Sequence, residues 1–310
     1  MKKDRIGTSA GSGTRLSQRR QLLRRLLPYL LLTPTLLLFL LLLIIPLLLS
    51  GYISLLDLRI GEHLNIKHFV GLENYLSFRI DSEFMRAVFT TLRYMVGTIS
   101  IELIVSLVLA VALSSNLPGI KIVRTFTILP MMTTPVILGA IFRLLFDYTF
   151  GWYNYFLSLV GIGPIGWLSN PSLALLTAIY TECWRGIPLV TLMLVAGISA
   201  LPLHVFEAAK IDGASSLQVF RRVTLPLLRP IIILALIIRS TDAIHAFDQV
   251  YTLTRGGPGH ATEVLGLAVY RSGIEMGRLG LGTAMSLILL VFAIGFGLLF
   301  VRFYQEYRGE

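Results

Sequence analysis

Charged residues and cysteine are both scarce in this chain. Only 14% of its 310 residues are charged, whereas a soluble domain carries about a quarter. In contrast, 55% are hydrophobic and the mean hydropathy is +0.76. The single cysteine, Cys183, lies in an apolar segment, which excludes a disulfide framework or a zinc site built by this chain alone. The composition predicts an all-α membrane protein.

Sequence patterns for nucleotide chemistry are missing as well. The chain has no G-x-x-x-x-G-K-[ST] run, and its glycine-rich stretch Gly256–Gly259 has no lysine to hold phosphates. The net charge of +10 comes without any pattern typical of nucleic-acid binding, so we expect no nucleic-acid partner. His63 and His68 lack metal-ligand spacing. We therefore predict no catalytic residue and no metal site.

Long apolar segments are what the chain does contain. Six of them are long enough to cross about 30 Å of hydrocarbon: 28–56, 87–114, 122–146, 173–200, 231–253 and 280–303. The basic N-terminal residues followed by the first apolar segment resemble a signal peptide. However, this apolar segment is too long for a signal peptide and lacks an A-x-A-like cleavage site. The sequence therefore predicts a basic tail over 1–27, a six-helix domain over 28–304 and a short tail over 305–310.

The distribution of lysine and arginine predicts the orientation in the membrane. Of the 27 such residues, sixteen fall on the side of the N-terminus and six on the opposite side; of the other five, Arg86 directly precedes the second span and four lie within spans. Basic residues concentrate on the cytoplasmic side of membrane proteins. We expect both termini and the loop 201–230 to be cytoplasmic in a multi-pass protein of the inner or plasma membrane.

The loop between the fourth and fifth spans is polar and reads as two short helices. Residues 204–211 form an amphipathic pattern, Gly213 permits a sharp turn, and a second helical pattern follows until Pro226 and Pro230 stop it. Physical chemistry alone leaves open a pair of helices lying along the lipid headgroups.

The residues of this loop resemble a family signature. Glu207-Ala208-Ala209, then Gly213, then Val223-Thr224-Leu225-Pro226 is similar to the EAA motif of inner-membrane permease subunits of binding-protein-dependent ABC importers. The stretches 71–75 and 247–254 resemble the sugar-transporting branch, which includes maltose, trehalose and glycerol-3-phosphate permeases. The resemblance implies the type I ABC importer permease fold with six transmembrane helices.

The resemblance also implies a role for the loop as coupling helices that dock in a cleft on a cytoplasmic ATPase. Glu207 then contacts the ATPase through its negative charge, and Gly213 sets the angle between the two helices. The small side chains of Ala208 and Ala209 allow the loop to enter a groove. The residues expected to couple to the ATPase are Glu207, Ala208, Ala209, Asp212, Gly213, Arg221 and Arg222.

Several partners follow from the same resemblance. They are a second homologous permease subunit, two ATPase subunits, an extracytoplasmic solute-binding protein, the sugar and the lipid bilayer. This chain is expected to bind no cofactor and to be no enzyme, because ATP and Mg belong to the partner ATPase.

Ionisable residues inside spans are costly in hydrocarbon and mark candidate sites. In maltose- and trehalose-type permeases the segments corresponding to the fourth and fifth spans line the solute pathway. The residues expected there are Trp184, Arg185, Gly186, Leu189, Arg239, Asp242, Ala243 and Ala246. The alternative is that Arg185 or Arg239 forms ion pairs inside the membrane with Asp242, Glu182 or Glu102. We expect a di- or oligosaccharide as cargo, with glycerol-3-phosphate as the alternative because two arginines suit a phosphate.

Two other classes of protein are alternatives to an ABC permease. An ion-coupled secondary transporter would use Arg239, Asp242 and His245 as a proton relay, but no inverted repeat is visible in the sequence. An intramembrane enzyme would use Asp242 and Asp248, whose spacing of six residues places them on different faces of a helix.

Overall fold

The computed structural model describes residues 29, 31–63, 68–78, 82–115 and 118–308. The predicted tail over 1–27 lies outside these residues. The chain divides into two compact units, which meet in sequence between Ile53 and Ser54 and are described separately. The described part of the first unit is one apolar helix, Leu31–Ile53, which contains a π-helical turn, Leu40–Ile44, followed by α2, Ile45–Ile53.

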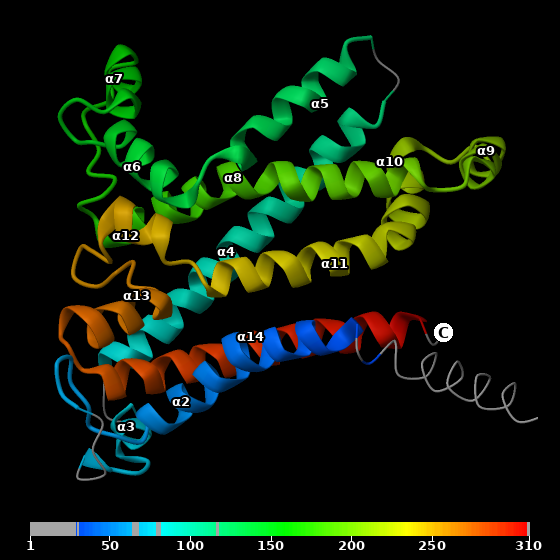
Figure 1. Ribbon diagram of the computed structural model, residues 1–310. Helices are drawn as coiled ribbons and strands as arrows, with labels where there is room; N and C mark the ends of the chain where they lie inside the picture. The colour runs from blue at the N-terminus through cyan, green and yellow to red at the C-terminus, as the bar shows by residue number, and fades with distance from the viewer. Residues whose placement is uncertain (1–28, 30, 64–67, 79–81, 116–117, 309–310) are drawn as a thin grey trace, which may run out of the picture. The chain divides into compact units, whose positions relative to one another are not determined.

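In the described residues of the second unit, all regular secondary structure is helical, apart from one isolated antiparallel bridge between Leu56 and Phe69 (Figure 1). Its helices are α3 (Glu73–Ser77), α4 (Ser82–Leu113), α5 (Ile120–Ile128), α6 (Pro135–Leu145), α7 (Trp152–Leu159), α8 (Pro171–Ser199), α9 (Leu203–Ile211), α10 (Ser216–Val219), α11 (Leu225–Ile244), α12 (Asp248–Thr254), α13 (Leu265–Tyr270) and α14 (Leu279–Arg308). Shorter turns connect some of them: the 3-10 turn Leu129–Met132 and the π-helical turns Phe220–Thr224 and Arg271–Glu275.

Five helices in the described residues are long and apolar enough to cross a membrane: Leu31–Ile53, Glu83–Leu113, Pro171–Ser199, Ser216–Ile244 and Leu279–Arg302. A sixth span requires two helices, Ile120–Met132 and Pro135–Leu145, which are bent by 96°. The prediction of six spans holds with this bent pair counted as one.

The third span is thus broken rather than continuous over 122–146. Thr133 and Thr134 both adopt extended backbone, with ψ of 131° and 145°. Because the ring of a proline disfavours helical backbone in the residue before it, Pro135 ends the first helix and, with its fixed φ, begins the next.

The fifth span differs from its prediction at both ends. One helix runs from Ser216 to Ile244, so Pro226 and Pro230 do not stop it, and it ends nine residues before the predicted limit of 253. At the π-helical turn Phe220–Thr224 the N–H of Leu225 bonds the carbonyl of Phe220. This wider turn shifts the hydrogen-bond register just before Pro226, whose missing N–H is tolerated in the first turn of α11.

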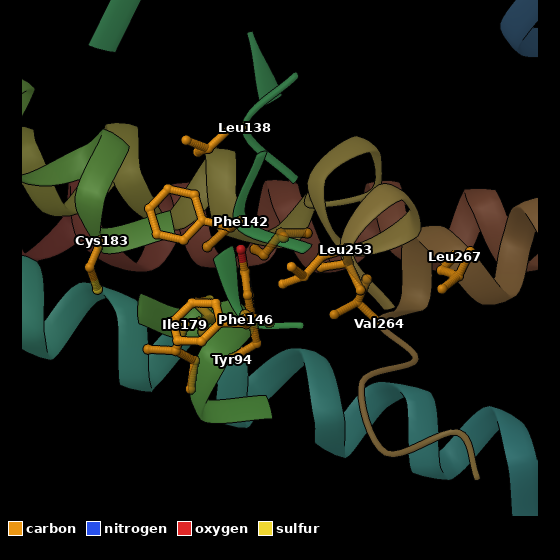
Figure 2. Packing of buried hydrophobic residues seen from close by; sticks show 14 residues of the cluster. Tyr94, Leu138, Phe142, Phe146, Ile179, Cys183, Leu253, Val264 and Leu267 are labelled. Atoms are coloured by element: carbon orange, nitrogen blue, oxygen red, sulfur yellow. The ribbon is translucent and has the colours of Figure 1, made fainter. Parts of the chain in front are cut away.

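Buried apolar side chains form the core where α4, α6, α8 and α12 meet (Figure 2). Phe142 of α6 and Phe146, which directly follows this helix, pack beside Tyr94 of α4 and Ile179 of α8. Asn170 fixes the start of α8, because its side chain accepts hydrogen bonds from the N–H groups of Ser172 and Leu173 at 3.0 and 3.3 Å. A second cluster joins α4 to α13 and α14, and a third joins α4, α8 and α11.

An aromatic contact ties α7 to this core. Tyr153 stacks on Phe146 with ring centroids 4.2 Å apart, and its hydroxyl lies 2.9 Å from that of Tyr180 on α8. Burial, followed by the hydrogen bond to Tyr180, raises the pKa of Tyr153 well above its ordinary value. The phenol therefore stays neutral and keeps this hydrogen bond across the physiological pH range.

Candidate functional site

The loop that carries the signature folds as two short helices joined by a tight turn. At the end of α9 the N–H of Gly213 bonds the carbonyl of Lys210 at 3.1 Å, and the N–H of Ala214 bonds that of Ala209 at 3.0 Å. This pair of bonds is a Schellman motif, which needs a left-handed residue after the helix. Gly213 supplies it with φ of +71°, so the prediction that Gly213 makes the turn is confirmed.

The second helix starts with a capping box. Ser215 accepts a hydrogen bond from the N–H of Gln218, whose side chain accepts in turn from the N–H of Ser215 at 2.8 Å. Because α10 continues into α11 without a break, the turn at Gly213 is attached rigidly to a membrane-spanning helix.

The predicted coupling residues lie on the surface of the loop. Glu207, Ala208, Asp212, Gly213, Arg221 and Arg222 are exposed, and Ala209 is half-buried. Large apolar side chains are exposed beside them: Leu203, Ile211 at 86% and Leu217. The opposite side faces the spans, where Phe206, Phe220 and Ile198 line a hollow of about 330 Å³. The loop thus presents a surface of mixed apolar and charged groups that the described residues leave uncovered.

Five charged side chains from three spans meet inside the second unit, and we call them the charge network. They are Glu102 of α4, Glu182 and Arg185 of α8, and Arg239 and Asp242 of α11. Arg239 is at the centre and only 3% exposed. Its guanidinium donates to both carboxylate oxygens of Glu102 at 2.7 and 2.8 Å, a bidentate geometry that suits an ionised carboxylate.

Two further acids complete the arrangement. Arg239 also donates to Glu182 at 2.5 Å and to Asp242 at 2.7 Å, and Arg185 donates to Glu182 at 2.6 Å. The ion pairs left open by the sequence are therefore present, and they bind α4, α8 and α11 together. Glu102 and Glu182 were absent from the predicted site, although a carboxylate inside a span was the signal that could have included them.

Gly186 makes this close approach possible. A Cβ placed there would lie 1.9 Å from Oε1 of Glu102 and 2.6 Å from Nη2 of Arg239. Any side chain at this position would displace the carboxylate from the guanidinium, so Gly186 serves the charge network directly.

The predicted pathway residues divide between core and surface. Gly186, Arg239 and Ala243 are buried, Arg185, Leu189 and Ala246 are half-buried, and Trp184 and Asp242 are exposed. The four pathway residues expected on the fifth span, Arg239, Asp242, Ala243 and Ala246, thus do not form one open face, because Ala243 packs in the core at 1% exposure. Arg239 turns inward because its partners lie there. The polar side of α11 that remains open carries Thr241, Asp242 and His245.

Comparison with known families decides the class of this chain. Residues 102–308 match the family described as binding-protein-dependent transport system inner membrane component. The chain belongs to this family. The permease is thus a transport component and not an enzyme, as predicted, and the membrane location predicted from its composition agrees with the family description.

Curated relatives agree with this assignment. The permease is 36% identical over 236 residues to the trehalose/maltose transport system permease protein MalF of Thermococcus litoralis, covering 76% of this chain and 80% of the relative. It is 36% identical to the probable ABC transporter permease protein y4oQ of Sinorhizobium fredii, covering 80% of each. The multiple sugar-binding transport system permease protein MsmF of Streptococcus mutans is 31% identical, over 72% of this chain and 77% of the relative.

Solved structures share the fold. A bacterial ABC transporter involved in import of the acidic polysaccharide alginate superposes with a TM-score of 0.80 at 22% identity, covering 93% of this chain and 99% of that one. The complex of such a transporter with an alginate pentasaccharide-bound periplasmic protein gives 0.78 at 23% identity, covering 90% and 94%. The permease therefore has the type I ABC importer fold predicted from the sequence.

Proposed function

We propose that this permease imports a carbohydrate, a di- or oligosaccharide, as one of two membrane subunits of an ABC importer. The observation that carries the proposal is the match to a trehalose/maltose permease, at 36% identity over three-quarters of the chain. The exposed indole of Trp184 beside Arg185 adds a chemical reason, because an aromatic face and charged hydrogen-bonding groups suit a sugar.

The energy for import comes from a cytoplasmic ATPase in this proposal. Glu207 and the exposed apolar residues of α9 and α10 form the contact, because an uncovered surface of this kind buries its apolar groups in a partner. Arg221 and Arg222 pair with acidic groups at the edge of that contact. ATP and Mg bind to the ATPase, and this chain binds no cofactor.

Transport proceeds by alternating access in this proposal. Closure of the two ATPases brings the coupling loops of the two permeases together, and each loop moves the helix α11 that continues from it. The solute-binding protein delivers the sugar at the outer side.

Uptake by proteoliposomes tests this function. The permease is reconstituted with its second permease, its ATPase and its binding protein, with ATP inside or outside the vesicles as the orientation requires. We expect accumulation of radiolabelled trehalose or maltose that needs hydrolysable ATP and persists with a protonophore. Uptake that the protonophore abolishes and ATP does not support would instead identify an ion-coupled transporter.

A further inference from the structure

The charge network does not balance. It holds two arginines, Arg185 and Arg239, against three carboxylates, those of Glu102, Glu182 and Asp242. Each carboxylate accepts a hydrogen bond from a guanidinium at 2.5 to 2.8 Å, which favours the ionised form of the acid. Burial opposes the ionised form of Glu102, so the network carries one surplus negative charge when all three acids are ionised.

The burial of each carboxylate determines where the surplus negative charge lies. Glu102 and Glu182 are buried with the guanidinium of Arg239, so their charges are compensated within the core. Asp242 is 41% exposed in its side chain and shares Arg239 with both of them. Asp242 accepts one hydrogen bond from a guanidinium, whereas Glu102 accepts two from Arg239 and Glu182 accepts one from each arginine. The least compensated carboxylate of the network is therefore the one that reaches the surface.

Arg185 does not cancel this charge. Its Nη2 is engaged with Glu182 at 2.6 Å, and its side chain is half as exposed as that of Asp242, at 22% against 41%. On the open side of α11, Asp242 is flanked by Thr241 and His245, and Asp248 follows beyond the end of the helix. Asp242 is thus the most exposed charged group of the network.

We propose that the charge network makes this surface a charge filter, which admits neutral sugars and rejects acidic ones such as uronates and sugar phosphates. Glu102 acts as the positioning residue, because its bidentate hold on Arg239 keeps the guanidinium inside the core and away from cargo. A like charge near a partly screened carboxylate is repelled. As a statement about cargo, this inference rests on the proposed function.

The electrostatic part is testable without a known sugar. Thr241 is replaced by cysteine in a Cys183→Ala background within the complete transporter, and the thiol is reacted with two methanethiosulfonates, one carrying a trimethylammonium group and one a sulfonate. The ratio of the two rates cancels the intrinsic reactivity of the thiol and reports the local charge. We expect the ratio to exceed that of the matched control, Ser158→Cys on α7, by about tenfold.

Two further substitutions should move the ratio in opposite directions. Adding Asp242→Asn should bring it toward the control value, and adding Arg185→Gln should raise it. Adding Glu102→Gln should lower it, with thermal stability in detergent measured alongside to show that the helices remain packed. A cysteine at His245 provides a second probe on the same side of α11.

A ratio at or below that of Ser158→Cys would overturn the filter, since the arginines would then dominate the surface. Inertness of both Thr241→Cys and His245→Cys would also overturn it, because no water-lined surface would exist there. If sugar uptake fails while the ratio holds, the proposed cargo is wrong and the preference against anions stands. If uptake succeeds and the ratio is inverted, only the filter is withdrawn.

Discussion

Arg239 donates to carboxylates from α4, from α8 and from its own helix, so one side chain fixes three spans. Between helices in a membrane such contacts replace much of the hydrophobic force that drives packing in water. Removal of one partner from a buried pair leaves an uncompensated charge, which costs about 3 to 5 kcal/mol. The charge network is for this reason the most sensitive point among the described residues.

Gly186 allows a matched comparison at this point. We expect Gly186→Ala to lower the melting temperature in detergent by several degrees, because the new Cβ would meet the carboxylate of Glu102 and the guanidinium of Arg239. Gly97→Ala serves as the control, since its Cβ would meet the end of the flexible Ile179 side chain at 2.7 Å. Equal shifts for the two variants would contradict a special role for Gly186.

The sequence shows which charged residues lie within the spans, but it does not show in which direction their side chains point. Ala243 and Ala246 were expected to line the solute pathway, and Ala243 instead lies in the core. The direction depended on Glu102, which is 137 positions from Arg239 along the chain. Spacing within one helix contains no information about a partner so distant.

The loop of α9 and α10 was more predictable, because its signals are local. The end of α9, the turn at Gly213 and the start of α10 depend on hydrogen bonds between residues three to five positions apart. The bend at Pro135 and the continuation through Pro226 were not predicted. In each case proline lacks an N–H and restricts the backbone of the residue before it, and the surrounding turn decides whether the helix stops.

Two substitutions of Gly213, in the loop of α9 and α10, should reduce uptake to different degrees. Nothing lies within 4 Å of a Cβ placed there, so a substitution acts only through the left-handed backbone. We expect Gly213→Asn to keep most ATP-driven uptake, because asparagine tolerates positive φ. Gly213→Val should lose most of it, since a β-branched residue is strongly disfavoured in that conformation.

Both variants should remain in the membrane in normal amounts, which quantitative immunoblotting of membrane fractions checks. Uptake by Gly213→Val equal to that of the unaltered permease would show that the angle between α9 and α10 has no bearing on coupling. A loss with Gly213→Asn as large as with Gly213→Val would point to the missing side chain rather than to the backbone.

For the whole molecule, the number of spans and the position of basic residues predict the topology. With the bent pair as one crossing, an even number of spans joins the two termini, and most lysines and arginines share their side. We expect a cytoplasmic reporter fused after Glu310, and another before Met1, both to be active. A phosphatase reporter active only outside the cytoplasm serves as the control, and activity at either end would contradict this topology.

The unbroken helix from Ser216 to Ile244 imposes a condition on how the sequence can change. Each residue of an α-helix advances the chain by about 1.5 Å and turns it by about 100°. The loss or gain of one residue between the capping box and Arg239 would therefore rotate the loop by more than a quarter turn relative to the guanidinium. The π-helical turn Phe220–Thr224 is one such added residue. Many substitutions in this stretch leave the rotation of the loop relative to Arg239 unchanged, whereas a single deletion alters it.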